Sequence, residues 1–290
     1  MKADVAVLVP SLNSPLLDRV VEAVLAQSGR ERLAEVLVVG RDEAGLLPPG
    51  PLVRFLDTGR PVSEPVARNL ALRHSQAERL VFLDSDCLPE PGWLAAHLAA
   101  FEQGPRLVSG SVRTGSESEP YWALVYNLAL FYAFLDVAPP GARQALPTLN
   151  LSFPRALAEA IGPFDESLPR ATDLEWTLRA AEAGVALHFE PAAAVRHLHA
   201  RHRLRQVWRD CAGSGQHSRR IRLRYGALLR TPAWLRWRLA VGLLAPALAV
   251  AVTARIAFGW PATFRGRWQA LPGVLLTRLA WGWGASRRPS

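Results

Sequence analysis

The sequence predicts an α/β protein whose mostly parallel sheet is flanked by helices and followed by a basic, apolar helical region. Up to about residue 200, short apolar runs alternate with helical patterns, which is typical of βαβ units. Beyond residue 204 the pattern becomes helical, arginine-rich and then strongly apolar. A chain of 290 residues, 20% charged and 50% hydrophobic, can bury one large core or two modest ones. We therefore expect one domain over residues 1–203 and a membrane-associated helical region over 204–290.

The expected strands are short apolar runs bounded by turn-forming residues. They lie at Val5–Val9, Glu35–Val39, Val53–Leu56, Leu80–Leu83, Leu107–Val112, Leu146–Phe153 and Val185–Phe189. The expected helices lie at Leu16–Ala26, Val66–His74, Trp93–Phe101, Tyr121–Leu135, Arg155–Ile161 and Thr172–Ala183. In the last helix, Thr172 is the expected N-cap, Glu175 completes a capping box, and Gly184 ends the helix.

The net charge of +9 is unevenly distributed along the chain. Residues 1–195 hold 16 basic and 24 acidic residues, whereas residues 196–290 hold 18 basic residues and one acidic residue, Asp210. The last third also contains seven of the ten tryptophans. Together with the apolar runs that accompany them, arginine and tryptophan favour an anionic membrane surface over nucleic acid as the partner. A basic helical subdomain is the alternative.

Two apolar runs stand out in this last third, Leu239–Thr253 and Leu271–Ala285. The first has 15 residues and contains Pro246, so it is short for a spanning helix, which needs about 20 residues. The sequence does not decide whether this run is a tilted, a re-entrant or a spanning segment. We expect the pair to be embedded in a membrane or to lie on it.

The expected location is the cytoplasmic face of the cell (inner) membrane. Cys87 and Cys211 are the only cysteines, too few for a disulfide framework, which favours a reducing compartment. The N-terminus carries a short strand-like run instead of the long apolar core of a signal peptide. The arginines beside the apolar runs should stay on the cytoplasmic side.

The stretch LVFLDSDC, residues 80–87, delivers two carboxylates to the end of an apolar strand. Side chains at i and i+2 of an extended segment share a face, so Asp84 and Asp86 can converge. Two like charges raise each other's pKa unless a cation is near, and oxygen ligands suit a hard divalent ion such as Mg²⁺ or Mn²⁺. The alternative is an ordinary turn whose aspartates accept hydrogen bonds from backbone N–H groups.

Five segments follow one another in order: VLVPSLN at 7–13, PVARNL at 65–70, LDSD at 83–86, TLNLSF at 148–153, and GPFDESLPRATDLEWTLRAAEAG at 162–184. Together they resemble the inverting nucleotide-sugar glycosyltransferases of family 2, which have the GT-A fold. Their order and spacing are more specific than any single segment. The resemblance covers roughly Val5–His199, and the C-terminal third matches only loosely.

The resemblance implies a role for each matching residue. The donor nucleotide would be bound by Pro10, Ser11, Asn13, Asp42, Arg68, Asn69 and Asp84, with Asn150 and Glu175 on the acceptor side. Asp86 and His197 would hold a divalent cation, Mn or Mg, with His199 as the fallback ligand; the alternative for His197 is a solvated histidine in a basic run. Asp173 would be the catalytic base. Its alternative role is stabilisation of a helix N-terminus, worth only about 0.3–1 kcal/mol.

The implied reaction moves a sugar from a nucleotide diphosphate donor to a saccharide or lipid-linked acceptor of the cell envelope. A cation between carboxylate and diphosphate would stabilise the charge that develops on the leaving group. Inversion requires one carboxylate to take the proton of the acceptor hydroxyl as it attacks. Gln216 and Arg219 only faintly match the motif of processive members, so a single transfer is expected.

Two positions depart from the family pattern. Gly40, in VVGRDEAG, stands where an aspartate usually contacts the base, and Asp42 or Glu43 is the expected substitute. Thr172 stands where a glutamate usually precedes the catalytic base. These departures support one alternative, a catalytically silent membrane scaffold. A nucleotidyltransferase is the other, although residues 10–18 lack its glycine-rich basic loop.

Overall fold

The computed structural model describes residues 3–104, 106–114 and 119–288. The chain forms two compact units. The first comprises residues 1–111, 140–167 and 175–198, and the second comprises residues 112–139, 168–174 and 199–290. The expected boundary at residue 203 follows the chain linearly, whereas both units are discontinuous. That boundary therefore stays a prediction.

The first unit is built on one sheet, in which the described residues form nine strands in the order β3-β2-β1-β4-β8-β6-β9-β5, with β7 pairing β9. The strands are β1 Val5–Leu12, β2 Leu33–Arg41, β3 Val53–Asp57, β4 Arg79–Leu83, β5 Cys87–Pro89, β6 Leu107–Arg113, β7 Gly141–Ala142, β8 Asn150–Pro154 and β9 Leu187–His197. The pairings among β3, β2, β1 and β4 are parallel. Strands β8 and β5 pair antiparallel with their neighbours. The sheet is therefore mixed.

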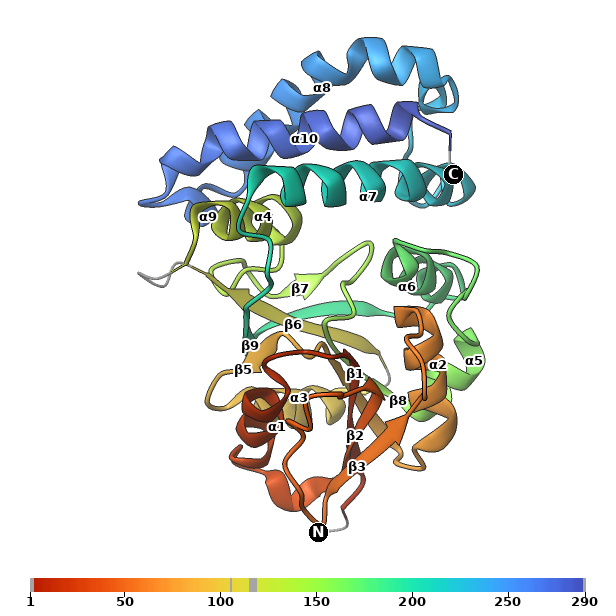
Figure 1. Ribbon diagram of the computed structural model, residues 1–290. Coiled ribbons are helices and arrows are strands. Elements are labelled where there is room, and N and C mark those ends of the chain that lie inside the picture. Colours follow the sequence, from red (N-terminus) through yellow and green to blue (C-terminus); the bar gives the residue numbers. More distant parts are fainter. Residues whose placement is uncertain (1–2, 105, 115–118, 289–290) are drawn as a thin grey trace. The chain divides into compact units, whose positions relative to one another are not determined.

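Helices cover both faces of this sheet, with α1 and α3 on one face and α2 and α5 on the other (Figure 1). Their bounds are α1 Leu17–Leu25, α2 Glu64–His74, α3 Trp93–Phe101 and α5 Arg155–Ile161, and α6 Thr172–Glu182 follows. A short 3₁₀ helix, η1, spans Arg30–Arg32. Helix α1 buries Leu17, Val20, Val21 and Val24, the i, i+3, i+4, i+7 spacing of one helix face. The predicted α/β class with flanking helices is confirmed.

The parallel strands are apolar without interruption because both of their faces are covered. Residues 5–9 of β1, 36–39 of β2 and 80–83 of β4 are fully buried. Since these strands are parallel, their carboxyl ends meet at one edge of the sheet. In open α/β sheets, ligands bind outside that edge.

A buried polar cluster joins α3 to β8. Trp93 Nε1 donates to Asn150 Oδ1 at 2.8 Å, and His97 Nε2 lies 2.8 Å from the same oxygen. Because Asn150 Oδ1 only accepts, Nε2 carries the proton of His97, and Nδ1 is free to accept from Ser152 Oγ at 2.9 Å. Burial lowers the pKa of His97 to about 4, so its ring is neutral.

The same asparagine ties β8 to β9 through a hydrogen bond from its Nδ2 to Ala193 O at 2.7 Å. Gly110 of β6 lies against this contact, and a Cβ atom there would overlap both Ala193 O and the Asn150 amide. Only glycine leaves room for the amide at this point. The cluster therefore holds the antiparallel half of the sheet together.

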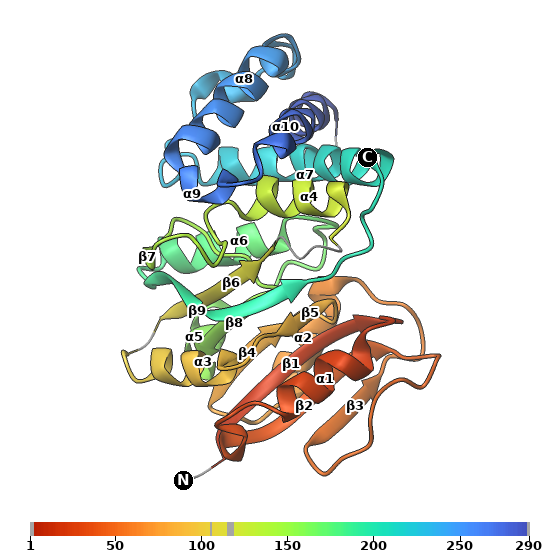
Figure 2. The ribbon, with the colours of Figure 1, turned by 90° about the vertical axis from the view of Figure 1, so that its left-hand side faces the viewer.

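The second unit is helical. It contains α4 Tyr121–Phe131, α7 Leu204–Arg224, α8 Arg238–Gly259, α9 Pro261–Phe264 and α10 Leu271–Ser286, with 3₁₀ helices η2 Ala233–Arg236 and η3 Trp268–Ala270. Helix α10 packs against α4, α7 and α8 (Figure 2). Glycines make these contacts close: a Cβ atom at Gly284 would overlap Ala212 O, and one at Gly215 would overlap Trp281 O.

The second apolar segment, Leu271–Ala285, forms α10, whose glycines allow close packing against other helices. Its association with a membrane stays a prediction. In the described part of the chain, one helix is long and apolar enough to cross a membrane, α8, with 22 residues. It extends beyond the predicted 15-residue run at both ends.

Helix α8 has one covered stripe and one open apolar face. Val241, Ala245, Ala249, Thr253 and Ile256 form the covered stripe. On the open face, the side chains of Leu239, Leu243 and Phe258 are 82–84% exposed. Exposed apolar surface of this kind marks a site of interaction with a protein or a membrane.

The neutral, buried His97 predicts a specific dependence of stability on pH. Its pKa is about 4 in the folded protein and about 6.5 in the unfolded chain, so only the unfolded state takes up a proton between these values. Stability is then fully present above about pH 6.5 and falls by up to about 3 kcal/mol as the pH drops to 4. We expect His97→Gln to flatten this slope in urea denaturation series. The exposed His74→Gln serves as the control and should keep the wild-type slope; equal slopes for His97→Gln and wild type would contradict the assignment.

Candidate active site

The two aspartates that follow β4 lie in a tight turn, residues 84–87, which we call the DSD turn. Cys87 N donates to Asp84 O at 2.9 Å, and this bond closes the turn. The expectation that Asp84 and Asp86 share a face of an extended segment is therefore wrong, because the chain reverses between them. Each carboxylate meets a different partner.

Neighbouring segments hold the DSD turn in place. The loop after β1, the residue before β8 and the residue after β9 each make one hydrogen bond to it. These bonds run from Ser14 Oγ to Ser85 O at 2.7 Å, from Asp84 N to Leu149 O at 2.9 Å and from Leu198 N to Asp86 O at 2.8 Å. Three strand ends thus fix the backbone that carries the two carboxylates.

Arg68 of α2 holds Asp84. Its guanidinium is fully buried, and Nη2 donates to Asp84 Oδ1 at 2.8 Å. Arg68 also pairs with Glu64, and its guanidinium carbon lies 5.6 Å and 5.7 Å from the ring centroids of Phe82 and Phe164. Although 28% of the Asp84 side chain is exposed, desolvation, together with the nearby Glu64 and Asp86, raises its pKa to about 6, against the lowering effect of Arg68. The arginine thus fixes the position of this carboxyl and favours its charged form.

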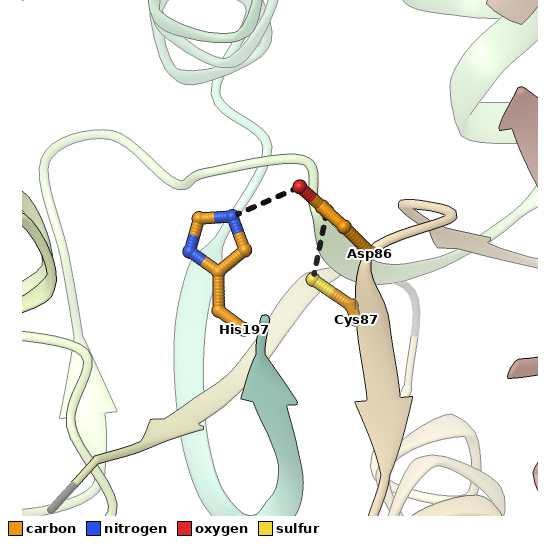
Figure 3. A group of neighbouring side chains, drawn as sticks. All are labelled: Asp86, Cys87 and His197. Atoms are coloured by element: carbon orange, nitrogen blue, oxygen red, sulfur yellow. Dashed lines mark hydrogen bonds and ion pairs between the residues drawn. The ribbon is translucent and has the colours of Figure 1, made fainter. Parts of the chain in front are cut away.

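Asp86 faces His197 at the end of β9. His197 Nε2 lies 3.6 Å from Asp86 Oδ2, and Cys87 Sγ lies 3.8 Å from Asp86 Oδ1 (Figure 3). Cys87 and His197 are directly opposite each other in the antiparallel pair of β5 and β9. One ligand atom from each of the three residues lies within 4.8 Å of the other two, close enough to share one ion.

The chemistry of these three groups fits a divalent cation held by a carboxylate and an imidazole. Burial, reinforced by the nearby carboxylates, raises the pKa of the Cys87 thiol. Sulfur ligands suit softer metals than Mg²⁺ and Mn²⁺. Carboxylates suit Mg²⁺ and Mn²⁺, and imidazole suits several first-row metals. Asp86 and His197 are therefore the residues that would hold the ion.

The residues predicted for the nucleotide lie at the carboxyl edge of the sheet. Pro10 and Ser11 belong to the end of β1, beside the end of β2. Asn13 follows β1 with a φ of 54°, and its Oδ1 accepts from Glu43 N at 2.9 Å. The carboxylate of Asp42 accepts from the N–H groups of residues 46 and 47 at 3.0 Å and 2.9 Å. Asn13 and Asp42 thus shape the loop that follows β2.

Three other predicted residues are engaged inside the protein. Asn69 Nδ2 donates to Glu166 Oε1 at 2.8 Å, which ties α2 to the segment of residues 162–166. Asn150 is the centre of the buried cluster, and Glu175 is buried with Oε2 accepting from Arg179 Nη2 at 2.9 Å. Contact of these side chains with a ligand stays a prediction.

Asp173 lies in the second unit, in the first turn of α6. Its Oδ1 accepts from the N–H of the next residue, Leu174, at 2.7 Å. Its side chain is half-buried. The role of Asp173 as a base also stays a prediction.

Sequence reasoning missed two residues of this site. Cys87 lies in β5, a strand of three residues that ends at Pro89, and so short a strand has no periodic signal. Proline is tolerated there because β5 is an edge strand. Ser14, directly after the predicted Asn13, could have been suspected from its place in the same turn.

A mixed sheet flanked by helices, with carboxylates and a histidine at the carboxyl edge of its parallel strands, is the architecture of a GT-A glycosyltransferase. Residues 6–154, about half of the chain, match Glycosyl transferase family 2, and the chain belongs to this family. Membership of this family sets the nucleotidyltransferase alternative aside.

Curated relatives match the N-terminal part of the chain. The Pre-mycofactocin glycosyltransferase of two Mycobacterium tuberculosis strains is 32% identical over 139 residues, which cover 46% of this chain and 29% of that protein. Glycosyltransferase AglE of Haloferax volcanii is 31% identical over 129 residues, which cover 42% of this chain and 40% of that protein. The match thus spans less than half the length of these relatives.

Solved structures share the fold. The mannosyltransferase PcManGT of Pyrobaculum calidifontis, in complex with GDP-Man and Mn²⁺, has a TM-score of 0.60 at 20% identity, covering 96% of this chain and 86% of that chain. TarS of S. aureus has a TM-score of 0.54 at 15% identity, covering 97% and 89%. GalNAc-T7 with UDP, GalNAc and Mn²⁺ has a TM-score of 0.53 at 15% identity, covering 68% and 44%.

The assignment of Asp86 and His197 as cation-holding residues predicts a pattern of Mn²⁺ binding. We expect Asp86→Ala and His197→Ala each to weaken Mn²⁺ binding by at least about tenfold in isothermal titration calorimetry, since even indirect partners of a metal contribute that much. Cys87→Ser should bind Mn²⁺ as wild type does, because Mn²⁺ prefers oxygen ligands to sulfur. His199→Ala tests the fallback ligand; a loss there, with His197→Ala unaffected, would reverse the assignment.

Proposed function

We propose that this glycosyltransferase moves a sugar, with inversion, from a nucleoside diphosphate sugar to a saccharide or lipid-linked acceptor of the cell envelope. The observation that carries the proposal is the pairing of Asp86 with His197 at the carboxyl edge of the parallel strands. The diphosphate of such a donor is anionic, so a cation is needed to hold it beside the carboxylates of this site. PcManGT and GalNAc-T7, solved with GDP-Man or UDP and with Mn²⁺, support the donor class and the cation.

The donor would lie across the ends of β1, β2 and β4. A divalent cation, Mn or Mg, would offset the negative charge that the departing diphosphate acquires. Asp84, held by Arg68, would accept a hydrogen bond from a hydroxyl of the donor's ribose or sugar. The buried guanidinium keeps this carboxyl in one position before the donor arrives, which lowers the cost of ordering it on binding.

Asp173 would act as the base. As the acceptor oxygen forms its bond to the anomeric carbon, its proton passes to the Asp173 carboxylate. On the opposite face, the bond from that carbon to the diphosphate oxygen breaks, and its electron pair leaves with the nucleotide. The first turn of α6 stabilises the carboxylate anion while it waits for the acceptor.

We place the protein at the cytoplasmic face of the cell membrane, with the open face of α8 against the lipid. Leu239, Leu243 and Phe258 supply the apolar contact. Arginines of the second unit, including Arg236 and Arg255, are exposed and suit anionic headgroups. A lipid-linked acceptor would be presented from the same surface.

The role of Asp173 predicts a selective loss of transfer. We expect Asp173→Asn to slow product formation by about 10²–10⁴-fold, the usual contribution of a general base, while nucleotide binding is retained. Transfer is measured as release of nucleoside diphosphate from a panel of nucleotide sugars with a membrane lipid extract as acceptor.

Asp18→Asn is a matched control for this variant. Asp18 also lies in the first turn of a helix, α1, and its Oδ1 accepts from the N–H of Arg19 at 2.7 Å. It should leave transfer unchanged. Wild-type transfer by Asp173→Asn would remove the base assignment, and no transfer by the wild type with any donor would favour the silent scaffold.

The open face of α8 predicts binding to lipid vesicles. We expect Leu239→Asp combined with Leu243→Asp to abolish co-sedimentation with vesicles of phosphatidylglycerol and phosphatidylethanolamine, because a charge in the bilayer interior costs about 2.5–3.5 kcal/mol. Both side chains are exposed, so folding should be unaffected. Leu228→Asp, at an exposed leucine outside α8, is the control. Unchanged sedimentation of the double variant would contradict the proposal.

A further inference from the structure

The end of β2 has no room for the side chain that the family usually carries there. Gly40 has a φ of 137°, and a Cβ atom at this position would overlap Ser11 O of the neighbouring β1. Thr58 N and Oγ1 also donate to Gly40 O, at 3.0 Å and 3.1 Å. The missing carboxylate is therefore excluded by the close approach of two strands.

The neighbouring strand supplies a carboxylate at the same level of the sheet. Asp57, the last residue of β3, pairs in register with Gly40. Its side chain is 51% exposed. Arg41 Nη1 donates to both of its oxygens, at 2.8 Å and 3.1 Å, and Gly59 N donates to Oδ1 at 2.9 Å. The bond from Gly59 and the pairing with Arg41 lower the pKa of Asp57, so it is ionised at neutral pH.

The two carboxylates expected from the sequence are less suited to this task. Both oxygens of Asp42 accept backbone N–H groups of its own loop. Glu43 lies on the other side of Arg41, with Oε1 accepting from Nη2 at 3.2 Å. Both oxygens of Asp57 are also engaged, but its side chain is half exposed at the end of β3, where a ligand can reach it.

The spacing of the strands suits a nucleotide. In the order β3-β2-β1-β4, three strand intervals separate Asp57 from the DSD turn. At about 4.8 Å per interval, the separation across the sheet is about 14 Å. A nucleoside diphosphate is an elongated ligand of similar length. With its phosphates at the DSD turn, its base would come to the end of β3.

We propose that Asp57, positioned by Arg41, recognises the donor's base and selects guanine. An ionised carboxylate only accepts hydrogen bonds, and guanine carries two adjacent donors, N1–H and N2–H₂, that match its two oxygens. Uracil carries one N–H between two carbonyl oxygens, which repel a carboxylate. Adenine and cytosine each place a ring acceptor beside their amino group. The inference rests on the proposed donor site.

The test exchanges a hydrogen-bond donor for an acceptor, or the reverse, on the side chain at position 57 and on the base of the nucleotide. Isothermal titration calorimetry in the presence of Mn²⁺ measures the affinities of the wild type and of Asp57→Asn for guanosine, uridine and xanthosine diphosphates (GDP, UDP and XDP). We expect the wild type to bind GDP at least about tenfold more tightly than UDP, as one good bidentate pair allows. We expect Asp57→Asn to lose this preference and to bind XDP more tightly than GDP, because xanthine has a carbonyl where guanine has N2–H₂. A purely structural role of Asp57 would not produce this exchange.

Glu102→Gln is the matched control. Glu102 is an exposed carboxylate that accepts from Arg79 Nη1 at 2.9 Å, and Arg79 begins β4 at the opposite end of the strand from the DSD turn. This variant should keep the wild-type preference. A wild-type preference for UDP, or an unchanged GDP to UDP ratio in Asp57→Asn, would overturn the inference. If nucleotides bind in a manner that depends on Asp86 but not on the base, only this inference fails; if none binds, the proposed donor site fails with it.

Discussion

The parallel pairing of β1 with β2 and with β4 is the constraint on which the candidate active site depends. It brings Ser11, Gly40 and the DSD turn to one edge, although they are distant in sequence. Burial of both faces stabilises these strands, because their apolar side chains are covered on each side of the sheet. The hydrogen bonds from Ser14 and Leu198 then add the loop after β1 and the end of β9 to the same edge.

Many of the strands and helices could be predicted from the sequence, because they depend on local patterns of apolar residues. Buried parallel strands are continuous apolar runs, and the helices α3 and α5 begin and end at the expected residues. The partnership of Asp86 and His197 followed from the family resemblance. The β-turn at residues 84–87 and the short β5 could not be predicted, since both are set by pairing with β9, more than 100 residues further on. Asn150 is similar: its motif was visible, but its burial among α3, β6 and β9 depends on tertiary contacts.

The C-terminal third shows a different limit of sequence reasoning. Apolar composition indicates that a segment is shielded from water, but it does not indicate whether protein or lipid covers it. Leu271–Ala285 avoids water by packing its glycines on α7 and α8, whereas α8 covers one stripe and leaves leucine and phenylalanine open. Glycines in α10 allow its backbone to approach α7 closely. The acidic part of the sequence up to residue 195 likewise carries most of the candidate active site, whereas the basic part that follows carries the open face of α8.

The contact between Gly40 and Ser11 O also bears on how this chain can evolve. Any side chain at position 40 would require the ends of β1 and β2 to stand further apart. Substitutions that alter this edge of the sheet are therefore more easily accommodated at the end of β3, where Asp57 is half exposed, than at the end of β2.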